Sequence, residues 1–87
     1  MIFCDIETRS RVDLKKSNVY RYAADPDFRI LMLAYAADDG PVKVTTDPEE
    51  ITRLLEAWIA DDETRIVAHH ANFERICFSA HLRNAGI

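Results

Sequence analysis

Apolar residues are distributed along the chain in a pattern that predicts four strands. Residues 2–8 form a short apolar run that two acids interrupt, and 29–37 is nearly continuous, as expected for a strand buried on both faces. A turn signal at 38–41, followed by the alternating segment 42–46, predicts that the second and third strands form a hairpin. The short apolar segment 65–69 predicts the fourth strand.

The clearest predicted element is an amphipathic helix that runs to about residue 60. Asp47 is its expected N-cap, Pro48 stands at the first helical position, and Glu50 completes a capping box. Apolar side chains then recur every three or four positions, at Ile51, Leu54, Leu55, Trp58 and Ile59. This spacing predicts that one face of the helix packs on the sheet.

A last helix is predicted after the fourth strand, with Asn72 as its N-cap and Gly86 as its stop signal. Its apolar stripe consists of Phe73, Ile76, Cys77 and Ala80. Residues 9–28 are polar and irregular, with a short helical turn expected at 18–23. The order strand, strand, strand, helix, strand, helix predicts a mixed α/β sheet in which the fourth strand returns beside the first.

Length and composition indicate one small domain. The chain has 87 residues, of which 48% are hydrophobic, and no apolar run approaches the roughly 20 residues of a membrane-spanning helix. We therefore expect no membrane association, and the absence of a signal-peptide pattern leads us to expect a cytoplasmic protein. The two cysteines, Cys4 and Cys77, lie in apolar stretches and are expected to be buried free thiols.

Charge is distributed unevenly. The net charge is -4, which argues against a protein that simply coats DNA. Residues 8–28 nevertheless hold five basic and three acidic side chains, a local charge of +2, with tyrosines Tyr20 and Tyr22 among them. Such a segment suits contact with a polyanion, since cations meet phosphates and aromatic rings stack on bases, and it equally suits an ordinary solvated loop.

Candidate chemistry centres on three acids. Because strand residues two apart share a face, Asp5 and Glu7 are expected to stand side by side, where like charges repel unless a cation lies between them. Glu74 is expected in the first turn of the last helix, which could bring a third carboxylate to the same end of the sheet. Oxygen ligands of this kind suit Mg²⁺. The alternative for Glu74 is an acid that merely favours a helix N-terminus.

With these motifs in view, the chain resembles a known family. "FCDIET" at residues 3–8, the hairpin and helix, and "IVAHHANFER" at 66–75 are similar to the 3′–5′ exonuclease domain of the DEDD (DnaQ-like) superfamily. The nearer resemblance is to bacteriophage DNA polymerases of family A, and it covers essentially the whole chain.

This resemblance implies an RNase H-like fold and hydrolysis of phosphodiesters with two metal ions, Mg²⁺ or Mn²⁺, at the 3′ end of single-stranded DNA. It implies that Asp5 bridges both metals, that Glu7 binds the metal carrying the attacking water, and that Glu74 lies near the other metal. The family also points to a bacterial host cell as the location. The residues expected to bind substrate are Thr8, Arg11, Tyr20, His70 and Asn72.

The chain departs from the family pattern in three respects. Most members have Asp where Glu74 stands, and they often have Asn where His70 stands; His70 and its neighbour His69 could equally be a solvent-facing strand end. The fourth acid and the His or Tyr base would follow a further strand, beyond Ile87, so we expect a partial domain that lacks the C-terminal strand and helix. Two alternatives follow: a non-catalytic RNase H-like stub that binds nucleic acid, and a homo-oligomer formed through the exposed sheet edge.

Overall fold

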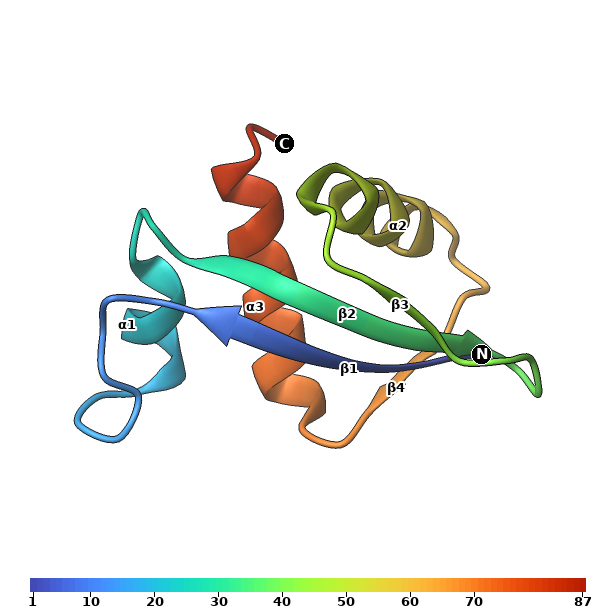
Figure 1. The fold of residues 1–87 in the computed structure, drawn as a ribbon, viewed down its shortest axis with the longest axis horizontal. Coiled ribbons are helices and arrows are strands. Elements are labelled where there is room, and N and C mark those ends of the chain that lie inside the picture. Colours follow the sequence, from blue (N-terminus) through green and yellow to red (C-terminus); the bar gives the residue numbers. More distant parts are fainter.

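The computed structural model describes all residues from Met1 to Ile87 and shows a four-stranded sheet with three helices (Figure 1). In chain order the elements are β1 (Ile2–Arg9), α1 (Val19–Ala24), β2 (Arg29–Ala37), β3 (Lys43–Thr45), α2 (Pro48–Ala60), β4 (Ile66–Ala68) and α3 (Ala71–Asn84). The four predicted strands and both predicted helices are present, and the helical turn expected at 18–23 is α1. No helix is both long and apolar enough to span a bilayer.

The strands are arranged in the order β3-β2-β1-β4. β1 pairs antiparallel with β2 and parallel with β4, and β2 pairs antiparallel with β3. The predicted hairpin and the predicted return of the fourth strand beside the first are therefore confirmed. β4 is short, and its pairing with β1 ends at Cys4, so one edge of β1 is free from Asp5 onwards.

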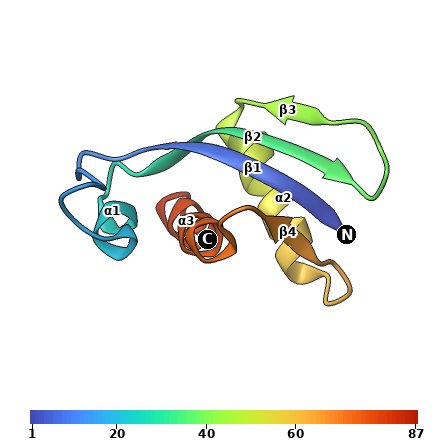
Figure 2. The ribbon, with the colours of Figure 1, turned by 90° about the horizontal axis from the view of Figure 1, so that it is seen from below.

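All three helices lie on the same side of the sheet, which leaves the other face without a covering layer (Figure 2). We call these sides the covered face and the open face. On β1, Cys4 and Ile6 point to the covered face and are 9% exposed, whereas Phe3 on the open face is 44% exposed. The prediction that residues 29–37 are buried on both faces is wrong, because Leu31 is 40% exposed where no helix covers the sheet.

The hydrophobic core fills the space between the covered face and the helices. Its fully buried large side chains are Phe28, Ile30, Leu33, Ile51, Leu55 and Cys77. Tyr35 of β2 packs edge-to-face on Trp58 of α2, with ring centroids 5.5 Å apart. Cys4 and Cys77 are both buried free thiols, as the sequence predicted.

The helix ends follow local sequence signals only in part. Asp47 is the N-cap of α2 and accepts a hydrogen bond from the Glu49 amide at 3.0 Å, but the predicted capping box with Glu50 does not form. The predicted N-cap of the last helix is also wrong. His70 occupies that position and makes no side-chain cap bond, while the side-chain Oδ1 of Asn72 accepts from the Arg75 guanidinium at 2.8 Å.

Candidate functional site

The acid pair Asp5 and Glu7 lies on the open face of β1, and both residues are exposed. The strand alternation that buries Cys4 and Ile6 turns these two carboxylates away from the helices. Asp5 Oδ1 accepts a hydrogen bond from the Ile6 amide at 3.0 Å. This bond holds the carboxylate against its own strand, beyond the point where β4 stops pairing.

Glu74 lies one turn into α3 and is buried, with only 4% of its surface exposed. Its Oε2 atom has no hydrogen-bond partner. The Glu74 charge also raises the pKa of two thiols: burial and Glu74 bring the pKa of Cys77 to about 12, and burial, Glu74 and Asp5 bring that of Cys4 to about 11. A buried acceptor without a donor costs about 1–3 kcal/mol, so this arrangement is unusual in a native protein.

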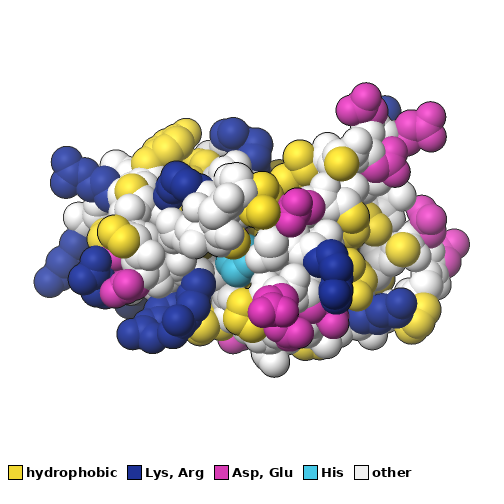
Figure 3. Space-filling model, turned by 90° about the horizontal axis from the view of Figure 1, so that it is seen from above, with side chains coloured by type: hydrophobic (Ala, Val, Ile, Leu, Met, Phe, Trp, Pro, Cys, Tyr) yellow, Lys and Arg dark blue, Asp and Glu magenta, His cyan; other side chains and the backbone are white.

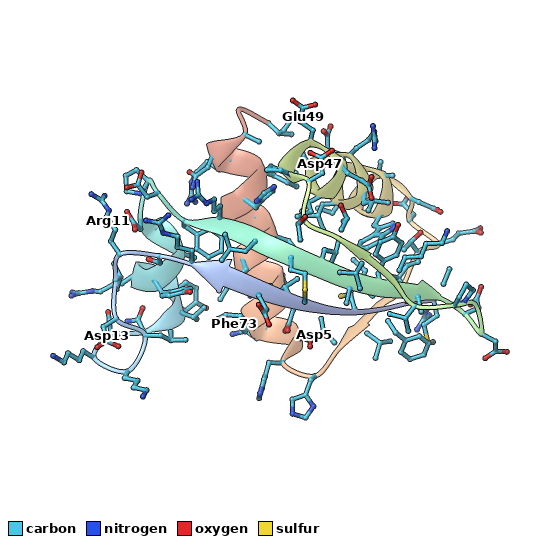
Figure 4. All side chains as sticks on the ribbon, in the orientation of Figure 1. Asp5, Arg11, Asp13, Asp47, Glu49 and Phe73 are labelled. Carbon is cyan, nitrogen blue, oxygen red and sulfur yellow. The ribbon has the colours of Figure 1, made fainter.

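The three acids approach β1 from different sides. Glu74 comes from α3 beneath the covered face, and Asp5 and Glu7 stand on the open face, with the Cys4 thiol under the influence of both Glu74 and Asp5. Figure 4 shows Asp5 on the part of β1 that overlies α3, and the two elements are in contact. No group of three or more His, Cys, Asp or Glu side chains is gathered closely enough to hold a metal ion in this structure.

Thr8 and Tyr22 form a contact on the covered side rather than on the open face. The β1–β2 register shifts between Glu7 and Thr8, and the Thr8 hydroxyl lies 2.8 Å from the Tyr22 hydroxyl. The Tyr22 ring packs edge-to-face on Phe28. Thr8 thereby ties β1 to α1, whereas Tyr20, on the same helix, is 62% exposed.

Arg11 is engaged within the chain by two aspartates. Its Nε and one terminal nitrogen donate to Asp25 Oδ1 at 3.0 and 2.8 Å, and Nε lies 3.2 Å from Asp27 Oδ2. The Arg11 guanidinium and backbone amide hold the pKa of Asp25 well below its usual range, and the pKa of Arg11 is raised in turn. Much of the positive charge expected from Arg11 is therefore neutralised locally.

His69, His70 and Asn72 lie in the connection from β4 to α3 and its first turn, and all three are exposed. The two histidine rings meet edge-to-face, with centroids 4.5 Å apart. Neither histidine makes a side-chain hydrogen bond to the rest of the protein. Their predicted contacts with substrate stay predictions.

His81 is a residue whose role the sequence analysis missed. It is 5% exposed, its Nδ1 accepts from the Ile30 amide at 3.3 Å, and its Nε2 lies 3.1 Å from the Thr52 hydroxyl. Since Nδ1 must accept, the ring is neutral with its proton on Nε2, and burial lowers its pKa. The spacing of His81 from Cys77 on the apolar stripe of α3 was the available signal.

His81 also lies at the base of a cavity of about 670 Å³ between α2, the end of α3 and the start of β2. Figure 3 shows a recessed histidine with basic and acidic side chains around it, and His81 is the histidine that lines this cavity. The charged residues that line the cavity are Arg9, Asp27, Arg29, Glu49, Arg53 and Glu56.

Comparison with known proteins adds one relative. No protein-family model matches the chain, and no solved structure matches it. A DNA polymerase of Bacillus phage SP02 is 46% identical over 79 residues, which cover 88% of this chain and 12% of the polymerase. The chain is similar to a segment of a phage DNA polymerase. This chain therefore spans about an eighth of the length of that polymerase.

Proposed function

We propose that the chain is part of the 3′–5′ exonuclease domain of a phage-type DNA polymerase, with an RNase H-like fold, and that the domain hydrolyses phosphodiesters at DNA 3′ ends. The similarity to the polymerase of phage SP02 supports the polymerase assignment. The mixed sheet order and the acid pair on an inner strand support the nuclease assignment. The observation that carries most weight is the buried Glu74 carboxylate. It lies beneath β1, the strand that bears Asp5, and its Oε2 has no hydrogen-bond partner.

The chemistry of these side chains suits a hard divalent cation, although the structure does not gather the three acids. Asp5, Glu7 and Glu74 offer only carboxylate oxygens, the ligands that Mg²⁺ and Mn²⁺ take, and the unpartnered Glu74 Oε2 lacks any competing donor. A bound pair of such ions would stabilise the attacking and leaving oxygens of the phosphodiester. Asp5 and Glu7 would face the substrate, because the open face above them carries no helix. The Ile6 amide keeps the Asp5 carboxylate oriented before any ion arrives.

A second function is favoured by a separate observation. The three acids are not gathered into a ready-made metal site, and the open face exposes apolar side chains, among them Phe3, Leu31, Val44 and Val67. A non-catalytic module that binds nucleic acid or another chain through this face would explain both features. Such a module would bind its partner without a metal ion and without the carboxylates of Asp5, Glu7 and Glu74.

Metal binding to the chain separates these two functions. We expect weak binding of Mn²⁺, since such ions rely on substrate phosphates for part of their shell, and loss of binding in Asp5→Asn and Glu7→Gln. Asp62→Asn is the matched control, because Asp62 is exposed in the α2–β4 connection and the change in charge is the same. Isothermal titration with Mn²⁺ measures the effect. Equal affinity in the chain and in both site variants would contradict the exonuclease proposal.

Nuclease activity of the 87-residue chain is expected to be slight. The three acids are assigned as metal ligands and none acts as the general base, and a positioned base typically contributes 10²–10⁴-fold to the rate. Release of 3′ mononucleotides from labelled single-stranded DNA with Mn²⁺ is the assay, with Asp5→Asn as the reference. Robust turnover that Asp5→Asn abolishes would show that these acids suffice, and robust turnover that survives in Asp5→Asn would show that they are not the site.

Glu74→Met tests whether Glu74 is kept for binding rather than for stability. Methionine has a similar volume and no polar atom, so the substitution removes an unsatisfied buried oxygen. We expect the metal-free variant to be at least as stable as the parent in urea and to have lost the stabilisation that Mn²⁺ gives. A clear loss of metal-free stability would instead make Glu74 a structural residue.

A further inference from the structure

Arg9 and Arg29 form an unpaired basic pair at one end of the sheet. They are direct partners in the antiparallel register of β1 and β2, and both are exposed. Neither guanidinium has a hydrogen bond or an ion pair anywhere in the chain, in contrast to Arg11, which contacts Asp25 and Asp27. Like charges directly opposite each other on paired strands are destabilising. The position therefore favours an anion between them.

The same two arginines line the cavity above His81. Of the acids on its rim, Asp27 is already engaged by Arg11 at 3.2 Å. Glu49 and Glu56 belong to α2 and contribute negative charge from the opposite wall. Arg53 of α2 also lines the cavity and lies 3.9 Å from Glu50, so the strand side, with two arginines, is where an anion is attracted most.

The pair also continues the line of the acids along β1. Asp5, Glu7 and Arg9 follow at two-residue intervals, about 6.6 Å each in a regular strand, with a register shift just after Glu7. A nucleic-acid strand that runs along β1 past the acid pair would reach Arg9 and Arg29 with a neighbouring phosphate. A guanidinium presents parallel donors that match phosphate oxygens, which suits this contact.

We propose that Arg9 and Arg29 bind a backbone phosphate of single-stranded DNA, away from the phosphate held at the acids. This inference rests on the proposed function for the course of the strand along β1. The site reads no base, because its donors meet only phosphate oxygens. Its contribution is to hold the substrate strand in register with Asp5 and Glu7.

Binding of a fluorescent oligothymidylate in EDTA tests the proposal without requiring metal or turnover. Arg9→Gln and Arg29→Gln should each lower the affinity, and the double variant, which loses the whole contact, should reduce the slope of log K against log salt by about 0.7, the value for one phosphate contact on a single strand. Arg9→Lys keeps the charge and should lie between the parent and Arg9→Gln. Unfolding midpoints of the variants show whether each is folded.

Arg65→Gln is the matched control. Arg65 is exposed, immediately precedes β4 at the other end of the sheet, and has no side-chain partner, so the change in net charge is identical. Its binding should equal that of the parent. Glu49→Gln with Glu56→Gln should tighten binding, because both acids face the proposed anion across the cavity. The proposal would be overturned if Arg65→Gln and Arg9→Gln lost DNA affinity equally. It would also be overturned if both site variants bound DNA with the affinity of the parent, or if the parent did not bind DNA.

Two further arms identify the ligand and separate this inference from the proposed function. Millimolar inorganic phosphate should displace DNA from the parent more than from Arg9→Gln, because the proposed site binds a phosphate group; equal displacement in both would count against the site. Asp62→Asn, which lies in the α2–β4 connection, should bind DNA normally in EDTA. If Asp5→Asn leaves Mn²⁺ binding unchanged while Arg9→Gln still weakens DNA binding, the exonuclease proposal fails and the phosphate site stands.

Discussion

Replacing His81 by leucine is expected to destabilise the chain strongly, because one ring connects three elements. His81 of α3 accepts from the Ile30 amide on β2 and lies 3.1 Å from the Thr52 hydroxyl on α2. The Thr52 hydroxyl donates in turn to the Pro48 carbonyl at 2.9 Å. Leucine fills a similar space but offers no acceptor, so the Ile30 amide is left buried without a partner.

The magnitude follows from that amide. A buried donor without an acceptor costs about 1–3 kcal/mol. His81→Asn places a carbonyl oxygen close to the position of Nδ1, so it should keep the Ile30 bond and lose only the contact with Thr52, with a smaller cost of about 1 kcal/mol. Domains of this size are stable by only about 0.05–0.15 kcal/mol per residue, so the leucine variant loses a large share of the total.

Urea denaturation followed by Trp58 fluorescence measures both variants. For an m value of about 1–2 kcal/mol/M, a loss of about 2 kcal/mol lowers the midpoint by about 1–2 M. The expected order of stability is parent, His81→Asn, His81→Leu. A leucine variant as stable as the asparagine variant would refute the reasoning, because the two differ mainly in the acceptor offered to Ile30.

The same ring predicts a dependence of stability on pH. The folded-state pKa of His81 lies below the ordinary value of 6.5, because burial disfavours the charged ring. Below pH 6.5 the unfolded chain binds a proton that the folded chain does not, so the free energy of unfolding falls as the pH falls until the folded pKa is reached. Arg29, Glu49, Arg53 and Glu56 line the same cavity and are unchanged in His81→Asn, so the difference between parent and variant isolates the histidine.

Three further predictions concern other buried groups. Asp25→Asn should destabilise the chain and detach the loop that Arg11 closes. Because the pKa of Asp25 is depressed in the folded state, its stabilisation is present above the unfolded pKa of 3.8 and is lost on further acidification, and measuring the stability of parent and variant against pH checks this. Cys4 and Cys77, with pKa values raised to about 11 and about 12, should react slowly with a thiol reagent at pH 8 and rapidly in urea; fast native labelling would contradict their burial. Trp58→Ala should cost about 3–5 kcal/mol in urea unfolding, since the ring is 9% exposed, and a cost below 1 kcal/mol would show that α2 packs otherwise.

The amino-acid sequence by itself determined most of the local structure. The alternation along β1 placed Asp5 and Glu7 on one face because strand side chains point alternately to either side. The 3.6-residue repeat located α2, and Asp47 with Pro48 located its start, since capping depends on residues that are neighbours in the chain. The two wrong capping predictions were also local in origin. Glu50 and Asn72 are residue types that can cap a helix, but their side chains contact Arg53 and Arg75 instead.

Only the tertiary structure decided which groups meet across the sheet. All three helices pack on one face, so the apolar run of β2 is half exposed although its composition suits a strand buried on both sides. The same packing buries Glu74 without a partner and inserts His81 between β2 and α2. The β1–β2 register sets Arg9 opposite Arg29. These juxtapositions join residues far apart in the chain, and they depend on how the whole set of apolar faces is buried at once, which no local pattern specifies.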